Sequence, residues 1–280
     1  MSWKTLGSIP PKELVDARLQ LHQAAQVVAS AGVSFLEPQP DDSHPNFGLV
    51  DSLGALVGRC LPRANEHVGL HVADLSLLLV DKSGRAVETF GLEGRKLEEG
   101  YAWLAAAMTR SGELTPSRGL ARADYAIPEH ATGSDASFSI ASRGAFSELS
   151  HWFANAHQTL AAFAARTDGA SEVRCWPHHF DLGTLIVIAT NPDESLAKSI
   201  GLGLSPGDES YAEPYCYVSP WPYPEAGALP ALECGGHWHT EGYTSAILTG
   251  SDLIAGPRES QSERLHSFLE SAVAASRRTL

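Results

Sequence analysis

The sequence has few cysteines, and none of them is placed for a paired site. Its 280 residues include four cysteines, and no two of them form a C-x-x-C pair. A zinc ribbon is therefore excluded, and a disulfide framework is not expected in a chain of this size. We expect a buried thiol at each position: Cys60, Cys175, Cys216 and Cys234.

Basic residues and long apolar runs are also scarce. Lys and Arg number 20 against 33 Asp and Glu, which gives a formal net charge of -13. Because phosphate contact needs a basic surface, neither nucleic acid nor an anionic membrane is expected as a partner. No segment approaches the roughly 20 apolar residues of a membrane-spanning helix, and the N-terminus lacks a signal-peptide pattern. We expect a cytoplasmic protein, and the sequence leaves a homo-oligomer open.

The chain contains helical and strand patterns in a composition typical of a globular protein, with 43% hydrophobic and 19% charged residues. Helical periodicity predicts helices over residues 12–31, 96–108, 145–165 and 259–276. Strand patterns predict strands over residues 70–80, 86–92, 173–189, 198–204, 214–218 and 237–248. The strand over residues 173–189 is expected to bend near Pro177. Consecutive strands without intervening helices indicate an antiparallel meander in the C-terminal half.

The two halves of the chain follow a similar order. Residues 71–80 resemble residues 178–187, with His, Asp and Leu in register. Chance similarity stays an alternative, because short apolar strands resemble one another easily. We predict an α+β fold of two similar halves related by internal duplication, each an antiparallel sheet with helices packed on one side. The predicted parts are an N-terminal half over residues 1–110, an extended connection over residues 111–144 and a C-terminal half over residues 145–280.

Histidines and carboxylates gather in the last third of the chain. In an extended strand alternate side chains share a face, so His237, His239 and Glu241 are predicted to point the same way. His179 and Asp181 repeat this spacing. Two such strands could surround one point with imidazole and carboxylate groups, which is what a divalent transition metal needs.

These patterns predict a site with separate roles for its residues. The predicted metal ligands are His178, His179, His237, His239 and Glu241, and the predicted ion is Zn, Fe, Mn or Ni. Because His178 and His179 stand on alternate faces of the predicted strand, at most one of them joins the shared site. Glu241 or Asp181 would act as ligand or general base. A small-molecule substrate would contact Trp176, Tyr215, Tyr217 and Trp238.

A serine turn in the same region matches another motif only by its letters. Residues 203–207, Gly-Leu-Ser-Pro-Gly, fit the G-x-S-x-G pattern of a nucleophile elbow. That elbow needs a helix directly after the serine, whereas Pro206 and a polar stretch follow Ser205. We therefore expect a tight turn here, with Pro206 and Gly207 at its centre.

Four segments resemble a known group of proteins. They read WPHHFDL, GLSPGD, EPYCYVSPWPYP and GGHWHTEGYTSAILTGSDL, and they lie between residues 173 and 254. The series resembles a group of bacterial proteins known only as a conserved domain of unknown function. The resemblance implies family membership and no activity. A related group has apolar or small residues where this sequence has His178 and His179, so a function that depends on them need not be shared.

Three functional hypotheses follow from these residues. The first is a metal-dependent enzyme, a hydrolase or an oxygenase-type centre, that acts on a small molecule. The second is a non-catalytic small-molecule binding protein that uses the same histidines as hydrogen-bond donors. The third is a buried polar network that stabilises the fold and binds no metal. Whether the protein is an enzyme stays open at this stage.

Overall fold

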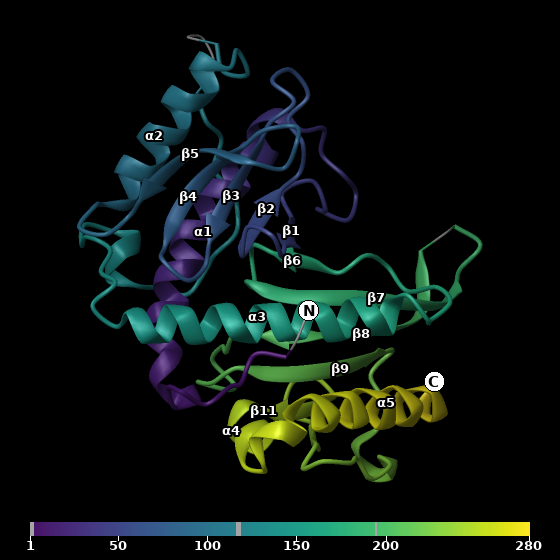
Figure 1. Cartoon of the computed structure of the whole chain (residues 1–280). Coiled ribbons are helices and arrows are strands. Elements are labelled where there is room, and N and C mark those ends of the chain that lie inside the picture. Colours follow the sequence, from purple (N-terminus) through teal and green to yellow (C-terminus); the bar gives the residue numbers. More distant parts are fainter. Residues whose placement is uncertain (1–2, 116–118, 194) are drawn as a thin grey trace. The chain divides into compact units, whose positions relative to one another are not determined.

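The structure is a computed structural model that describes residues 3–115, 119–193 and 195–280 (Figure 1). Residues 116–118 of the predicted connection lie outside the described residues. The chain forms two compact units. Unit 1 consists of residues 1–13, 151–173 and 181–280, and unit 2 consists of residues 14–150 and 174–180.

Unit 2 is a sheet packed against a long helix. The strands are β1 (Phe47–Val50), β2 (Ala55–Gly58), β3 (His67–His71), β4 (Ser76–Val80), β5 (Ala86–Gly91) and β6 (Arg174–Trp176). They pair antiparallel in the order β6-β1-β2-β3-β4-β5. The helices are α1 (Val15–Phe35), α2 (Leu97–Arg110) and η2 (Ala131–Gly133), and the last residue of η1 (Pro11–Leu14) also belongs to this unit. α1, purple in Figure 1, packs against β2, β3 and α2.

The sequence of α1 explains this packing. Leu21, Ala25 and Val28 recur at helical spacing and are almost completely buried. Several other buried positions of the helix hold small residues, which let neighbouring segments approach closely. Gly32 is one of them, since a Cβ there would lie 2.7 Å from the Cα of Pro45. The loop before β1 can therefore rest directly on the last turn of the helix.

Unit 1 is an antiparallel meander with helices. Its strands are β7 (Asp181–Thr190), β8 (Leu196–Ser205), β9 (Tyr215–Trp221), β10 (His237–His239) and β11 (Ser245–Thr249). The strand order is β10-β11-β9-β8-β7. The helices are most of α3 (Arg143–Ala164), η3 (Ala226–Ala228), α4 (Gly250–Ile254), η4 (Arg258–Ser260) and α5 (Gln261–Thr279). α5 packs on β9 and β8 through Leu265, Phe268 and Leu269.

The α+β class is confirmed, because the protein combines helices with antiparallel strands. The four predicted helices correspond to α1, α2, α3 and α5. None of the helices in the described ranges has the length and apolar character that a membrane crossing requires.

Two of the predicted strands are interrupted by a turn, and one of these turns lies at the expected bend near Pro177. Residues 70–80 form the end of β3, a turn and β4, and residues 173–189 contain β6, a turn over residues 177–180 and most of β7. Each turn ends on a residue with left-handed backbone, Leu75 (φ 52°) or Phe180 (φ 57°). Both side chains are completely buried. An apolar residue at the turn therefore gave the sequence the appearance of one continuous strand.

Candidate functional sites

β10 in unit 1 carries the first candidate site. His237 and His239 share one face of this strand, as the alternation predicts, and both contact the hydroxyl of Tyr211. The Tyr211 oxygen lies 3.1 Å from Nε2 of His237 and 3.1 Å from Nδ1 of His239. Trp238 makes a separate contact, in which its Nε1–H donates to the carbonyl of Pro230 at 2.7 Å. We call Tyr211, His237 and His239 the phenol–imidazole cluster.

The hydrogen bonds of the cluster fix its protons. Nε2 of His239 lies 2.8 Å from the backbone carbonyl of Glu241, which can only accept. His239 therefore carries its proton on Nε2 when neutral, and its Nδ1 accepts from the Tyr211 hydroxyl. The Tyr211 oxygen in turn accepts from Nε2–H of His237. The donors therefore all point the same way along the chain of hydrogen bonds, from His237 to Tyr211 to His239 to the Glu241 carbonyl.

Glu241 does not continue the face of the two histidines. β10 ends at His239, and residues 241–243 form a bend before β11 begins at Ser245. The prediction of one strand over residues 237–248 is therefore wrong at this point. Glu241 offers its backbone carbonyl to His239, and its carboxylate lies close enough to raise the pKa of Tyr211.

Asp208 positions Tyr211. It follows the turn at Gly207 (φ 115°), where the buried hydroxyl of Ser205 accepts from Gly207 N–H at 3.1 Å. The Asp208 carboxylate accepts from Tyr211 N–H at 3.0 Å, and Asp208 N–H donates to the Tyr211 carbonyl at 2.8 Å. The same carboxylate accepts from the Tyr215 hydroxyl. Ser205 is the last residue of β8, a bend follows at Pro206, and no helix follows Ser205 directly.

Aromatic rings extend the cluster along the sheet. Tyr211 lies 5.0 Å from Tyr215, and His239 stacks on Tyr243 at 4.3 Å between ring centroids. Burial is the main cause that raises the pKa of Tyr211, and Tyr243, Asp208 and Glu241 add to it. Burial and then the Asp208 hydrogen bond raise the pKa of Tyr215. Both phenols are therefore protonated at neutral pH.

Tyr217 holds the other predicted carboxylate. Its hydroxyl donates to Asp181 at the start of β7. Its ring lies over two glycines, because a Cβ at Gly203 or Gly183 would lie 2.6 or 2.8 Å from the Tyr217 oxygen. The glycines of β7 and β8 thus make room for the ring. Asp181 is bound by a phenol here, and its role as a general base stays a prediction.

The second candidate site starts from the turn over residues 177–180 in unit 2. The carbonyl of Pro177 accepts from Nε2 of both His22 and Gln26 on α1, each at 2.9 Å. The ring of His22 stacks on Phe180 at 5.4 Å. These contacts fasten the turn to the helix. His178 and His179 therefore lie in a turn, and the prediction that they alternate along a strand is wrong.

His178 faces a cavity of about 360 Å³, which we call the cleft. Its walls are contributed by α1, the loop before β1, the connection after α2 and the turn. The lining residues are Val33, Asp42, His44, Pro45, Ala123, Asp124, Tyr125, Pro177 and His178. The cleft therefore brings two carboxylates, two imidazoles and a phenol ring to one apolar hollow.

The cleft is built on a short network. The Tyr125 hydroxyl donates to Oε1 of Gln26 at 2.9 Å, and the amide of Gln26 donates to Pro177. The Tyr125 ring meets His178 edge-on at 5.7 Å between centroids. One glutamine on α1 thus holds both walls, and the Tyr125 ring is fixed by packing and by its hydroxyl.

Burial sets the charge of His178. It is the main cause that lowers the pKa of His178 from 6.5, the neighbouring His179 lowers it further, and Asp42 opposes the shift. His178 is therefore neutral at neutral pH. His179 is exposed, with its ring centroid 4.3 Å from that of His178. Trp176 meets His178 edge-on at 6.1 Å.

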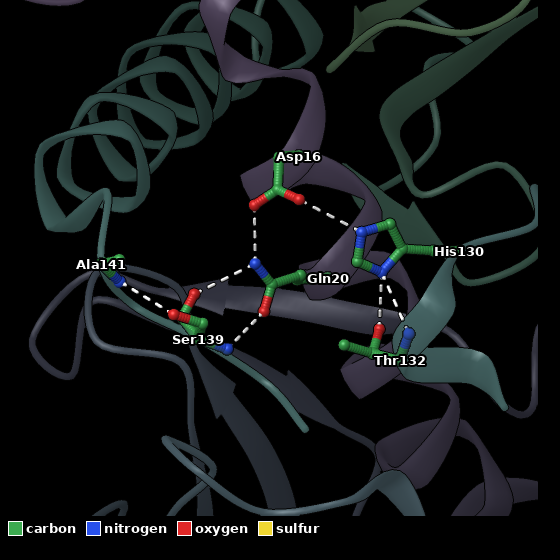
Figure 2. Close-up of polar contacts among 6 residues, drawn as sticks. All are labelled: Asp16, Gln20, His130, Thr132, Ser139 and Ala141. Atoms are coloured by element: carbon green, nitrogen blue, oxygen red, sulfur yellow. Dashed lines mark hydrogen bonds and ion pairs between the residues drawn. The ribbon is translucent and has the colours of Figure 1, made fainter. Parts of the chain in front are cut away.

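A third group resembles a catalytic triad in its residue types only. His130 contacts Asp16 through Nε2 at 3.2 Å and the hydroxyl of Thr132 through Nδ1 at 2.8 Å (Figure 2). Thr132 is buried, and its backbone N–H also donates to Nδ1 of His130, which caps η2. Gln20 adds bonds to Asp16 and to both backbone groups of Ser139. We interpret this network as the attachment of the connection to α1.

The predicted site residues fall in both units. Trp176, His178 and His179 belong to unit 2, whereas Asp181, Tyr215, Tyr217, His237, Trp238, His239 and Glu241 belong to unit 1. Within the described part of the chain, no group of three or more His, Cys, Asp or Glu is arranged to hold a metal. The predicted ligand set is thus not assembled from these residue types within either unit.

Sequence reasoning missed several residues of both sites. Tyr211 belongs to an aromatic segment, but nothing in its spacing links it to β10. Asp42 and His44 lie in a loop rich in proline and acidic residues, and Asp124 and Tyr125 lie in the connection. The mixture of Asp, His and Tyr in two predicted loops could have indicated a polar site formed by those loops.

Comparisons with known proteins identify no relative. No protein-family model, no curated protein and no solved structure matches this chain. The resemblance to a bacterial domain of unknown function therefore stays a prediction.

Proposed function

We propose that the protein binds a small organic cation in the cleft of unit 2. The observation that carries this proposal is the presence of two carboxylates, Asp42 and Asp124, at one cavity beside an aromatic ring. Among the described residues that line the cleft, none is Lys or Arg. A cation that enters would therefore meet negative charge without an internal counter-ion.

The other polar groups suit the same ligand. The Tyr125 side chain lines the cleft, and the faces of aromatic rings attract ammonium groups. Neutral His178 offers a nitrogen lone pair to an N–H donor. The formal charge of -13 adds a long-range attraction for cations. Charge, aromatic wall and hydrogen-bond acceptor all favour an amine.

The size and walls of the cleft favour a short alkylamine. A volume of about 360 Å³ lies at the lower end of ligand pockets, which span about 300 to 1,000 Å³. Val33, Pro45 and Pro177 give apolar wall for a methylene chain. The best-fitting ligand class is thus an amine with a short carbon chain.

Isothermal titration with butane-1,4-diamine tests the proposal. The matched control ligand is butane-1,4-diol, which keeps the chain and removes the charge. We expect the diamine to bind and the diol not to bind. Asp42→Asn and Asp124→Asn should each weaken diamine binding about tenfold, which is about 1.4 kcal/mol. Asp168→Asn, an exposed aspartate that does not line the cleft, should leave binding unchanged.

Two results would count against this function. Equal binding of diol and diamine would show that charge does not select the ligand. Equal weakening by Asp168→Asn would show that the effect comes from net charge and not from the cleft.

A metal-dependent function is a second candidate, and the phenol–imidazole cluster favours it. If the cluster holds a metal, the predicted reaction is hydrolytic or of the oxygenase type, and Glu241 or Asp181 is the predicted general base. No reaction is assigned to it. The cytoplasmic location, the homo-oligomer and the internal duplication also stay predictions.

A further inference from the structure

We propose that Tyr211, His237 and His239 bind one divalent transition-metal ion through the phenol oxygen, Nε2 of His237 and Nδ1 of His239. The inference is independent of cation binding in the cleft, because its three residues belong to unit 1. It replaces the ligand set predicted from the sequence. A tyrosine takes the place that the spacing gave to Glu241.

The distances from the Tyr211 oxygen to the two nitrogens fit one ion. Ligand atoms about 2.1 Å from a metal lie about 3.0 Å apart at a right angle and about 3.4 Å apart at the tetrahedral angle. The Tyr211 oxygen lies 3.1 Å from each of the two nitrogens. Small shifts of the side chains would therefore convert these hydrogen bonds into a shared coordination site.

The surroundings already orient two of the ligands. His239 donates Nε2–H to the Glu241 carbonyl, so the lone pair of Nδ1 points at the shared position. Ligating histidines usually make such a bond with their second nitrogen. Asp208 holds the backbone of Tyr211 on both sides.

The local charge favours a cation. Two acidic residues adjoin the proposed ligands: the Asp208 carboxylate accepts from Tyr211 N–H at 3.0 Å, and His239 contacts the backbone carbonyl of Glu241. A positive ion would offset this negative field and stabilise the phenolate. Proton balance is simple: the Tyr211 phenol releases one proton to solvent, and exposed His237 exchanges its proton from Nε2 to Nδ1.

The donor set identifies the class of ion. Two imidazole nitrogens and one phenolate oxygen suit Zn, Cu, Fe or Ni and are poor ligands for Mg or Ca. Since His237 is exposed, water can complete the coordination. The site belongs to the class with open positions.

Equilibrium dialysis against Zn²⁺ tests the proposal on the full chain without a polyhistidine tag. We expect one ion per chain. His237→Ala, His239→Ala and Tyr211→Phe should each weaken Zn²⁺ binding at least about tenfold. The control is His266→Ala, whose ring binds the carbonyl of Ser262 in its own helix and should leave Zn²⁺ binding unchanged.

A titration of the unmodified chain with Cu²⁺ gives a readout that needs no variant. A visible phenolate-to-copper absorption band and the release of one proton per ion are expected. Absence of that band, absence of Zn²⁺ binding, or binding that survives both histidine substitutions would overturn the proposal. Diamine binding in the cleft should be the same in all four variants, so failure of one proposal is distinct from failure of the other.

Discussion

Single carbonyl acceptors decide the protonation of two histidines in this protein. Pro177 receives Nε2–H from His22, and Glu241 receives Nε2–H from His239. A carbonyl cannot donate, so each ring has one neutral tautomer that satisfies the contact. In both cases a backbone carbonyl just after a strand fixes which ring nitrogen carries the proton and which is free to accept a hydrogen bond.

His22 predicts a loss of stability in acid. Burial is the main cause that lowers its pKa from 6.5 to about 4, with the bond to Pro177 opposing and Arg18, His179 and His178 adding to the shift. The neutral ring is favoured in the folded state, so its stabilisation is complete above pH 6.5. It is lost as pH falls from 6.5 to 4, by an amount on the order of 3 kcal/mol.

Urea unfolding at several pH values measures this effect. His22→Gln keeps an amide donor without a titrating group, so its unfolding free energy should change less over the same interval. An equal slope for the wild-type protein and the variant would show that His22 does not cause the acid sensitivity.

His178 predicts that cation binding depends on pH. Its pKa is lowered below 6.5 by burial and by His179, so the ring is neutral above that pH. Protonation in more acidic solution adds a positive charge to the cleft and removes an acceptor. Diamine affinity should therefore be constant at neutral pH and fall once the pH drops below the pKa of His178. Titrations of His178→Gln should show a weaker fall, and an unchanged fall would contradict this role.

At the scale of elements, β8 depends on glycine where Tyr217 crosses it. A Cβ at Gly203 would meet the carbonyl of Leu182 and would lie 2.6 Å from the Tyr217 oxygen. We expect Gly203→Ala to lower the unfolding free energy by about 1 to 3 kcal/mol, because backbone must shift. Gly201→Ala on the same strand is the control, since its nearest neighbour is the Ser219 carbonyl at 3.9 Å.

Denaturant unfolding of the two variants separates strain from strand propensity. Gly201→Ala should be neutral or slightly stabilising, because alanine loses less backbone entropy than glycine. If both variants lose stability equally, contact with Tyr217 is not the reason that position 203 needs glycine.

Periodicity predicted elements well where one face is buried and poorly at turns. α1 and α5 follow from apolar residues at helical spacing, and those apolar residues are buried. α1 also buries polar side chains outside the apolar face, such as Gln20 and His22. The turn before β4 escaped prediction because Val72 and Leu75 are buried core residues as well as turn residues. Pro177, by contrast, marked the bend before β7. The end of β10, two residues before Glu241, also escaped prediction, because no proline or change in apolar pattern marks it in the sequence.

The predicted repeat shows the same limit. The alignment that paired His71 with His178 used side-chain types alone. The observed turns end on Leu75 and Phe180, which is two residues out of step with that pairing. Short apolar strands carry too little information to fix such a register.

At the scale of the whole molecule, the sequence could not predict how the chain divides. Residues 174–180 belong to unit 2, whereas the residues on both sides of this segment belong to unit 1. No change in composition marks these positions. The histidines near residue 178 and those near residue 238 therefore have different local partners, and both sets of partners come from distant parts of the sequence.

Net charge predicts the salt dependence of ligand binding. A formal charge of -13 attracts cations over distances that added salt screens, with a screening length of about 10 Å at 0.1 M. Diamine affinity should therefore fall as sodium chloride is added, while any affinity for the diol should not change. Titrations over a salt series measure this, and a diamine affinity independent of salt would contradict an electrostatic contribution.

The most direct test of the central claim is a ring-proton NMR titration of the wild-type protein with butane-1,4-diamine. Cation binding in the cleft predicts that the signals of His178, His44 and Tyr125 shift together and saturate, and that butane-1,4-diol leaves them in place. Shifts confined to other histidines, or no shift at saturating diamine, would contradict it.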